Sequence, residues 1–322
     1  MEDTLRCVVV RVDARQCEVV PADACGRPLW EEEVLPAQMR GRLFEERRED
    51  RVPLAVGDRV RAVREGSELV VDAIEPRRNL FARRAAGEDA RRQPLAANVD
   101  RLAVVAGFGN PPFSSITTDR ILAAASFQDI PAVLVLNKTD LARRRRLEAV
   151  TATYRRAGYP VLWTSARRRE GLEELAALLK DHCTVLYGLS GVGKSSLLNG
   201  LEPGLGLRTR ATSRSLKSGR HTTTFARMYP LAMGGAVIDT PGVRVFRPWG
   251  LPPHELRLHF PEFREAGRRC RFPDCLHREE PGCAVLAARE AGEDFPESRY
   301  RSYLELLEEL EGVYGGTGRK ED

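Results

Sequence analysis

Short apolar runs separated by turn residues fill the first part of the chain. The runs are Cys7–Val12, Cys17–Val20, Arg59–Val63 and Leu69–Ile74. Strands of this number and length predict a small β-barrel over residues 1–92, and we favour an OB-fold. The arginine-rich segment Arg40–Arg51 is expected to be a long loop between strands, which either contacts RNA or is simply solvated.

Residues 93–250 alternate strand-like and helical runs. Strands are expected at Leu102–Ala106, Ala132–Leu136, Val161–Trp163, Val185–Tyr187 and Ala236–Ile238. Helices are expected near Thr118–Ser126, Arg144–Arg156, Leu172–Leu179 and Ser195–Leu201. This alternation predicts a parallel sheet covered by helices, and such sheets bind ligands beyond the carboxyl ends of their strands.

Residues 251–322 differ in character, because a cluster of cysteine and histidine is followed by helical periodicity. An apolar stripe, for which core packing is the expected role, is formed by Leu304, Leu306, Leu307 and Leu310. The complete pattern predicts a multidomain α/β protein with a barrel, a central α/β domain and a helical C-terminal domain.

A glycine-rich string with a lysine and serines follows the strand expected to end at Tyr187. Its backbone N–H groups can surround the β-phosphate of a nucleotide, Lys194 can reach the β and γ oxygens, and the Ser195 hydroxyl can bind Mg²⁺. The phosphate-binding residues predicted here are Gly188, Ser190, Gly191, Val192, Gly193, Lys194, Ser195 and Ser196.

Residues suited to guanine come earlier in the chain. The Asn137 amide meets guanine N7 and O6, and the Asp140 carboxylate meets N1–H and N2–H, so adenine would leave that carboxylate unpaired. The Lys138 stem is expected to cover the base plane, and the backbone at Ser165 and Ala166 to touch guanine O6. Because the base motif precedes the phosphate loop, the reverse of the usual order in GTPases, the two motifs together predict a circularly permuted GTPase domain.

Two further segments are typical of nucleotide switches. Asp239 follows an apolar strand and can hold Mg²⁺ through water, and the Gly242 N–H can sense the γ-phosphate. In the stretch between the phosphate loop and Asp239, we favour Thr223 to complete the magnesium shell. Val243 cannot activate water, so we expect slow intrinsic hydrolysis. His221 is the candidate to position the water, and a structural role for it is the alternative.

Three thiols and an imidazole lie within one short segment near the C-terminal end. Cys270, Cys275, His277 and Cys283 are the ligand types of tetrahedral Zn²⁺, and a closed set of this kind leaves no open catalytic position. We therefore expect one structural zinc ion per chain. The alternative is a group of unrelated buried thiols.

The composition of the chain indicates which class of partner it binds and in which compartment it acts. Lysine and arginine total 51 in a chain of 322 residues, the net charge is +5 and the pI is about 8.9, which suits a polyanionic partner such as RNA. No apolar run is long enough to span a membrane, and the first residues lack the pattern of a signal peptide. Seven unevenly spread cysteines argue against a disulfide scaffold. We expect a cytoplasmic protein.

Assembled in order, these motifs resemble those of a known family over nearly the whole chain. The matching stretches are Val56–Val60, Ala97–Asp100, Asn137–Asp140, Gly188–Ser196, Gly219–Thr224, Asp239–Gly242 and Cys270–Val285. The chain resembles the ribosome small subunit-dependent GTPase A family, the RsgA type. The arginine runs Arg143–Arg146 and Arg167–Arg169 are not part of that pattern, and they are either solvated faces or RNA contacts.

The resemblance implies an OB-fold domain, a permuted GTPase domain and a zinc domain. It also implies binding to the 30S ribosomal subunit and its 16S rRNA, a role late in maturation of that subunit, and release when the 30S subunit stimulates GTP hydrolysis. Two rivals stay open at this point. One is a permuted GTPase that serves the large subunit, and the other is a zinc-dependent RNA-binding module whose nucleotide site only switches conformation. GTP and GDP are the expected ligands, and we expect a monomer.

Overall fold

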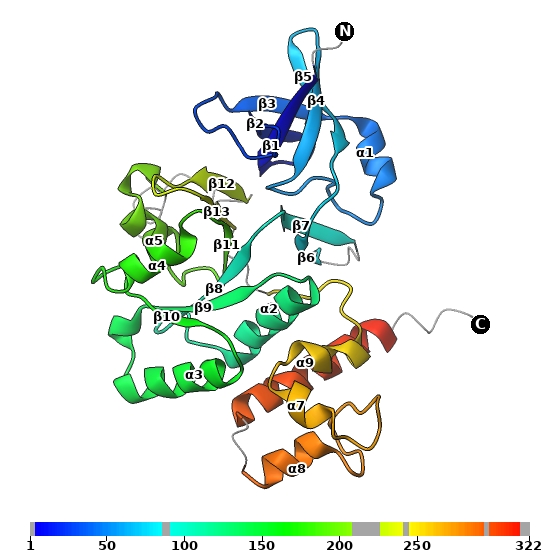
Figure 1. The fold of residues 1–322 in the computed structure, drawn as a ribbon, viewed down its shortest axis with the longest axis vertical. Helices are drawn as coiled ribbons and strands as arrows, with labels where there is room; N and C mark the ends of the chain where they lie inside the picture. The colour runs from blue at the N-terminus through cyan, green and yellow to red at the C-terminus, as the bar shows by residue number, and fades with distance from the viewer. Residues whose placement is uncertain (1–3, 86–90, 208–225, 241–244, 293–295, 316–322) are drawn as a thin grey trace, which may run out of the picture.

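The computed structural model describes residues 4–85, 91–207, 226–240, 245–292 and 296–315. Three parts follow one another along the long axis of the molecule: a β-barrel, a layered α/β part and a small helical unit (Figure 1). This arrangement confirms the predicted multidomain α/β class with a barrel in front.

Five strands close the N-terminal barrel. They are β1 (Thr4–Val12), β2 (Gln16–Pro21), β3 (Leu35–Met39), β4 (Arg59–Glu65) and β5 (Glu68–Ile74). The sheet runs β1-β2-β3-β5-β4, and β4 pairs again with β1 to close the circle. Because side chains alternate between the two faces of a strand, Val9, Val19 and Val71 all point inward and are fully buried.

The segment Arg40–Arg51, expected to be a loop throughout, contains a helix, α1 (Gly41–Glu46). Leu43 is the buried residue of this helix and packs in the same core as the barrel strands. Two adjacent apolar residues, Leu43 and Phe44, give no helical periodicity, which explains why the expectation was wrong.

The central part is a six-stranded stretch of sheet in the order β10-β9-β8-β11-β13-β12. Its strands are β8 (Arg101–Gly107), β9 (Ala132–Asn137), β10 (Val161–Trp163), β11 (Cys183–Tyr187), β12 (Arg227–Pro230) and β13 (Ala236–Asp239). All are parallel except β12, which runs antiparallel to β13. The carboxyl ends of β8, β9, β11 and β13 therefore meet at one edge, where the predicted motifs begin.

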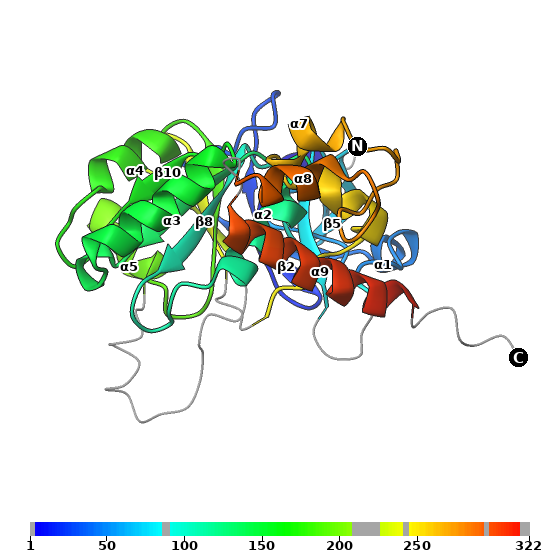
Figure 2. The ribbon, with the colours of Figure 1, turned by 90° about the horizontal axis from the view of Figure 1, so that it is seen from below.

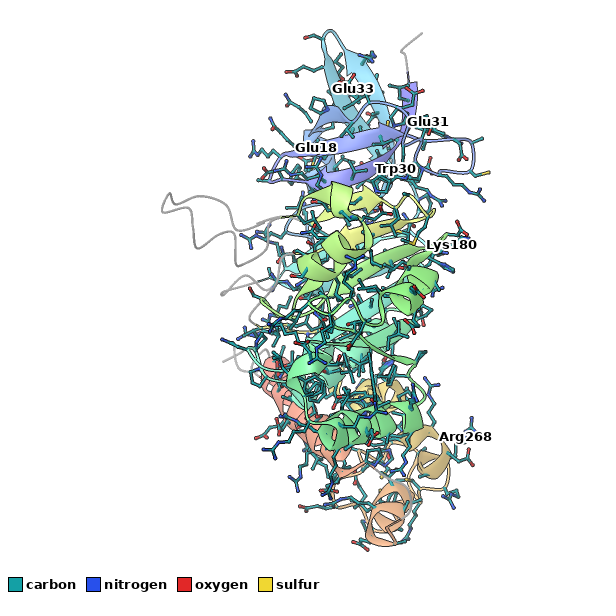
Figure 3. All side chains as sticks on the ribbon, turned by 90° about the vertical axis from the view of Figure 1, so that its left-hand side faces the viewer. Glu18, Trp30, Glu31, Glu33, Lys180 and Arg268 are labelled. Carbon is teal, nitrogen blue, oxygen red and sulfur yellow. The ribbon has the colours of Figure 1, made fainter. Side chains whose placement is uncertain are left out.

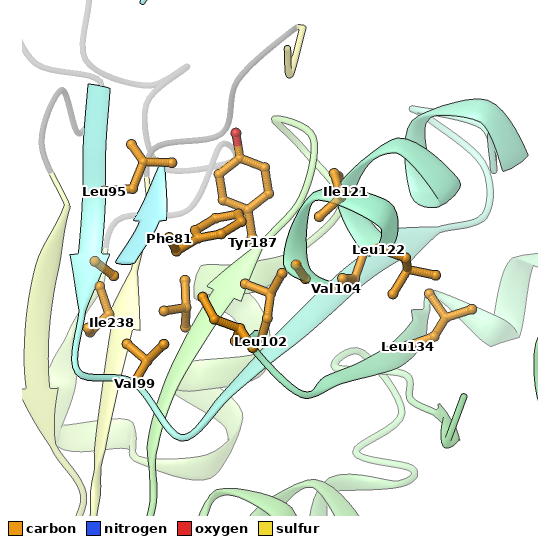
Figure 4. Close-up of a cluster of buried hydrophobic side chains, with 14 of the residues drawn as sticks. Phe81, Leu95, Val99, Leu102, Val104, Ile121, Leu122, Leu134, Tyr187 and Ile238 are labelled. Carbon is orange, nitrogen blue, oxygen red and sulfur yellow. The ribbon is translucent and has the colours of Figure 1, made fainter. Parts of the chain in front are cut away.

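Helices cover both faces of this sheet. They are α2 (Ser115–Phe127), α3 (Arg144–Arg156), α4 (Leu172–Leu179) and α5 (Lys194–Leu201). Leu102 and Val104 of β8 face the core that contains α2 and α3, whereas Ala103 and Val105 face the core that contains α4 and α5. Figure 4 shows the first of these cores, in which Ile121 and Leu122 of α2 lie over the sheet.

A hairpin and a strand pairing are among the features that join the barrel to the sheet. A hairpin of β6 (Leu80–Arg84) and β7 (Arg92–Ala97) lies between them (Figure 1), and the predicted division at residue 92 falls where β7 begins. β12 pairs with β1, and Glu18 on the barrel (Figure 3) forms ion pairs with Arg11 at 2.9 Å and with Arg227 at 3.0 Å. The barrel thus continues the sheet beyond β12 through a single bridge.

In the described residues of the C-terminal unit, a 3-10 helix is followed by three α-helices. They are η3 (Pro253–His259), α7 (Phe263–Gly267), α8 (Ala284–Glu290) and α9 (Glu297–Gly315). The long helix α9 lies against α2 of the central part (Figure 2), so this unit is docked on the α/β layer. Within the described residues, no helix combines the length and the apolar character needed to cross a membrane.

Candidate nucleotide site and candidate metal centre

The predicted phosphate loop connects β11 to α5, as a strand–loop–helix unit requires. Gly191 and Gly193 adopt φ angles of 86° and 101°, which favour glycine. A Cβ at Gly193 would overlap the Asn137 amide nitrogen, so a side chain is excluded there by the base motif itself. Of the other loop residues, Ser190 is exposed, Ser196 is half-buried and Val192 is buried.

Lys194 and Asp239 are both buried at the carboxyl edge of the sheet, and their opposite charges interact. Burial lowers the pKa of Lys194, and the nearby Asp239 carboxylate partly opposes this shift. Burial likewise raises the pKa of Asp239, against the effects of Lys194 and Ser195. The Lys194 ammonium donates to the Gly188 carbonyl at 2.9 Å, so the side chain lies against the predicted phosphate loop.

Ser195 was predicted to bind Mg²⁺ directly and Asp239 to hold it through water, and these two side chains lie together, whereas the other predicted ligand, Thr223, lies outside the described residues. The Ser195 hydroxyl donates to Asp239 Oδ2 at 3.4 Å. Asp239 Oδ1 is buried and has no hydrogen-bond partner among the described residues. Thr240 fixes the strand end, because its hydroxyl donates to the Leu186 carbonyl at 2.7 Å. A hard cation that prefers oxygen ligands fits this donor set, since it would engage the unpartnered carboxylate oxygen.

Asn137 joins the base motif to the phosphate loop. Its amide nitrogen donates to the Val192 carbonyl at 2.8 Å, and its amide oxygen accepts from the Thr164 hydroxyl at 3.2 Å. The side chain is fully buried in this position. These two bonds set the orientation of the amide and leave one of its N–H groups for a ligand.

Lys138 adopts a left-handed backbone conformation with φ of 60°. Its ammonium donates to the Gly191 carbonyl at 2.5 Å and to the Asn110 carbonyl at 2.7 Å. The base motif, the phosphate loop and the loop that follows β8 are therefore held together by one side chain. The sequence did not indicate Asn110, because a backbone acceptor has no signature in residue type.

Asp140 and Ser165 lie together although they belong to different loops. Asp140 is in a short 3-10 turn, η1 (Thr139–Leu141), and its Oδ1 accepts from the Ser165 hydroxyl at 2.7 Å. Ser165 is fully buried, and the adjacent Ala166 is half-buried against the core under α4 and α5. All the predicted base-binding residues thus converge on one edge of the sheet. The predicted residues His221, Thr223 and Gly242 lie outside the described residues.

The four predicted metal ligands also come together. The ligand atoms of Cys270, Cys275, His277 and Cys283 all lie within 4.8 Å of one another. His277 Nδ1 is 3.6 Å from the Cys270 sulfur and 3.4 Å from the Cys283 sulfur, and those two sulfurs are 4.0 Å apart. Tetrahedral zinc with bonds of about 2.3 Å to sulfur requires ligand separations of roughly 3.8 Å, and the separations of 3.4, 3.6 and 4.0 Å lie close to that value.

The surroundings of this cluster suit a metal with thiolate ligands. Backbone N–H groups of Ala284 and Leu286 donate to the Cys270 and Cys283 sulfurs at 3.4 and 3.5 Å. Burial lowers the pKa of His277 to about 4, so its ring is neutral and able to bind a metal. Burial also raises the pKa of Cys275 to about 12, and a nearby cation would be needed to hold this thiol as a thiolate.

Helix α9 fixes the segment between the cluster's ligands. The Tyr300 hydroxyl donates to the His277 carbonyl at 2.7 Å, and the Tyr303 hydroxyl donates to the Leu276 carbonyl at 2.6 Å. The Glu280 carboxylate accepts from the N–H groups of Leu276 and Arg278 at 2.6 and 2.7 Å. Although partial burial acts to raise the pKa of Glu280, these N–H donors lower it overall.

The fold and the order of the motifs define the class of circularly permuted GTPases, since the base motif on β9 precedes the phosphate loop after β11. A family model described as RsgA GTPase matches residues 74–249. The chain belongs to this family of GTP-hydrolysing enzymes.

Similar proteins agree over most of the chain. A protein from Gemmatimonas aurantiaca named "Small ribosomal subunit biogenesis GTPase RsgA" is 43% identical over 279 residues, which cover 86% of this chain and 90% of the relative. The crystal structure of YjeQ from Thermotoga maritima matches with a TM-score of 0.71 at 32% identity, over 96% of this chain and 99% of that one. The structure of YloQ, described as a circularly permuted GTPase, matches with a TM-score of 0.68 at 28% identity, over 96% of each chain.

Proposed function

We propose that this chain acts in late maturation of the small ribosomal subunit, binding the 30S particle and its 16S rRNA and hydrolysing GTP to GDP and phosphate. The 30S subunit stimulates that hydrolysis. The name of the Gemmatimonas relative and its coverage support this role. The structural observation that carries the GTP part is the bond from Asn137 to the Val192 carbonyl, which joins the base motif and the phosphate loop into one site.

Guanine is recognised by Asp140, which binds N1–H and N2–H, and by the free N–H of Asn137. The Ser165 hydroxyl holds the Asp140 carboxylate in place at 2.7 Å, and the backbone at Ala166 lies against O6. The Lys138 stem covers the base plane. Lys194 leaves the Gly188 carbonyl to bind the β- and γ-phosphate oxygens, because a charged acceptor is stronger than a neutral one.

Ser195 and Thr223 would hold Mg²⁺ directly and Asp239 would hold it through water when the ion arrives with GTP. The chemistry supplied by the ion would be positive charge opposite the β- and γ-phosphate oxygens. The unpartnered Asp239 Oδ1 supports this assignment. The Gly242 N–H contacts the γ-phosphate, and His221 positions the attacking water, since Val243 offers no polar group for that role.

Cys270, Cys275, His277 and Cys283 hold one zinc ion, which stabilises the C-terminal unit and takes no part in chemistry. The spacing of their ligand atoms supports this. In this proposal residues 1–92 form an RNA-binding OB-fold domain, residues 93–250 the GTPase domain and residues 251–322 the zinc domain. The protein acts in the cytoplasm as a monomer.

Sedimentation with purified subunits tests the ribosomal role. Protein loaded with a non-hydrolysable GTP analogue is expected to pellet with 30S subunits and to be released when GDP replaces the analogue. Enrichment on 50S subunits would transfer the role to the large subunit. Binding to 30S particles that does not respond to the nucleotide would favour an RNA-binding module without a GTP-driven cycle.

A further inference from the structure

Two arginine runs lie beside the candidate guanine site. The first, Arg143–Arg146, begins three residues after Asp140, and the second, Arg167–Arg169, begins two residues after Ser165; all seven side chains are exposed. Because Asp140 and Ser165 are hydrogen-bonded at 2.7 Å, the two runs start within roughly 27 Å of each other even with the chain fully extended. We call these seven arginines the arginine rim.

Aromatic rings and neighbouring groups hold part of the rim in place. The Arg144 guanidinium lies over the Trp163 ring at 4.7 Å and pairs with Glu148 at 2.6 Å. The Arg146 guanidinium lies over the Phe108 ring at 5.7 Å. These contacts fix the first run to the end of β10 and to the loop after β8.

Arg168 pairs with Glu170 at 3.9 Å and Arg169 donates to the Gly200 carbonyl at 3.1 Å, but the other three members of the rim carry charge without a partner in the described part of the chain. Among the residues that the structure describes, Arg143, Arg145 and Arg167 form no ion pair and no hydrogen bond through their side chains. Seven positive charges are opposed by the two carboxylates that pair with rim residues, Glu148 and Glu170. The rim is therefore a concentrated positive patch.

Stability of the fold does not account for this patch. Helix α3 has no acidic residue in its first turn, where Arg144, Arg145 and Arg146 stand. Cations in the first turn oppose the helix dipole and repel one another, and both effects lower the stability of the helix. A local arrangement that lowers helix stability in this way is typical of a functional surface.

We propose that the arginine rim is a docking surface for the phosphodiester backbone of double-helical RNA. A single guanidinium group can donate two parallel hydrogen bonds to two oxygens of one phosphate. Seven arginines on one surface therefore suit a polyanion. The aromatic faces beside the rim, those of Trp163 and Phe108, are already covered by Arg144 and Arg146. Stacking of unpaired bases needs a free ring face. Contact with the phosphate backbone of a duplex is therefore favoured over binding of single-stranded RNA. The proposal rests on the small-subunit role proposed above, and it adds the location of an RNA-binding surface on the GTPase domain.

A triple variant, Arg143→Gln with Arg145→Gln and Arg167→Gln, tests the rim, because none of these side chains has a partner in the described structure. Its Kd for 30S subunits and for a mixed-sequence RNA duplex is measured between about 50 and 200 mM KCl. The slope of log Kd against log salt concentration reports how many phosphates the protein neutralises. The single variants Arg145→Gln and Lys180→Gln each remove one exposed cation, the first inside the rim and the second outside it, and their Kd values are compared. Lys180 (Figure 3) is an exposed cation beside the amino end of β11, at the opposite edge of the sheet.

The triple variant is expected to bind both probes between about 10- and 100-fold more weakly, with a salt slope shallower by roughly three. Arg145→Gln should lower the slope by about one, and Lys180→Gln should leave it unchanged. Affinity for a fluorescent GDP analogue should stay at the wild-type value, which shows that the site is folded.

Three results would overturn the proposal. They are equal affinity and slope for wild type and triple variant, equal losses for Lys180→Gln and Arg145→Gln, and loss of 30S binding with unchanged duplex binding. The last would mean that the rim meets an acidic ribosomal protein. Failure of the wild type to bind 30S subunits would instead refute the small-subunit role, and the duplex measurements would still decide whether the rim binds RNA.

Discussion

Arg299 and Asp119 form an ion pair of 2.6 Å in which both side chains are fully buried. Arg299 lies in α9 and Asp119 in α2, so the pair joins the C-terminal unit to the GTPase sheet. Glu262 binds the same guanidinium at 2.6 and 3.0 Å, and the Phe260 ring packs against it. The metal-bearing unit is thus anchored on α2, which follows the loop that Lys138 ties to the nucleotide site.

Removal of this guanidinium should loosen the C-terminal unit. Arg299→Ala leaves two carboxylates buried without a counter-charge, and breaking a buried pair in this way costs about 3–5 kcal/mol. We expect a matching fall in the free energy of unfolding, measured by urea titration with far-ultraviolet circular dichroism. Arg301→Ala on the same helix removes an exposed pair with Glu297 and should cost no more than about 1 kcal/mol. Equal effects of the two variants would contradict the anchoring role.

Asp140→Asn should change the base that the enzyme prefers. An amide no longer matches the N1–H and N2–H of guanine, but it can donate to the second carbonyl of xanthine. We expect kcat/KM for GTP to fall about 10²- to 10⁴-fold and that for xanthosine triphosphate to rise. Ser165→Ala serves as the control, because it removes the bond to Asp140 but keeps the carboxylate and its preference for guanine. Unchanged GTP preference in Asp140→Asn would remove Asp140 from the base site.

Metal analysis of the purified protein should find about one zinc ion per chain. Cys283→Ser should lower this content strongly, since the Cys283 sulfur lies 3.4 Å from His277 Nδ1 within the cluster. Helical signal from the C-terminal unit should fall, while GDP affinity is retained at the separate nucleotide site. Cys25→Ser, at an exposed cysteine outside the cluster, should change neither quantity. A metal-free protein with the full helical signal would refute the zinc assignment.

Asp100 gives a pH-dependent contribution to stability. Partial burial acts to raise its pKa, but the N–H of Cys183 at 2.7 Å and the Arg78 guanidinium at 2.7 Å lower it overall. Since the folded pKa is depressed, this stability is present above the ordinary pKa of 3.8 and is lost as the pH falls through the lower folded value.

Asp100→Asn should therefore cost about 1–2 kcal/mol at pH 7 in urea unfolding. The gap between wild type and variant should narrow once the pH drops below about 4. A gap that stays constant down to pH 3 would show that the charge of Asp100 contributes nothing.

Local patterns predicted the strands and helices of the central part because each contains an apolar run, and several of the strands end in a motif. The run Leu172–Leu179 became α4 with the same bounds, and Arg144–Arg156 became α3. The motifs of the nucleotide site were predictable for a related reason: a phosphate loop or a base motif consists of adjacent residues. Their convergence also followed, since the carboxyl ends of parallel strands share one edge.

Features that depend on distant partners were not predictable. The bridge between β1 and β12 pairs Arg11 with Arg227, and neither residue has an apolar signal that would select the other. The burial of Arg299 is equally hidden, because an arginine in a helix ordinarily faces solvent and only the acceptors on α2 and near α7 make its burial tolerable. Such contacts are set by tertiary packing.

The most direct test of the account is the steady-state rate of GTP hydrolysis with and without purified 30S subunits. Alone, the protein should turn over slowly, and 30S subunits should raise the rate at least about tenfold, because a partner in trans completes many GTPase sites. The same amount of 50S subunits should have no such effect. Lys194→Ala should be inactive under every condition, since it lacks the cation that binds the β- and γ-phosphates. A rate that 30S subunits leave unchanged, or a Lys194→Ala protein as active as wild type, would contradict the account.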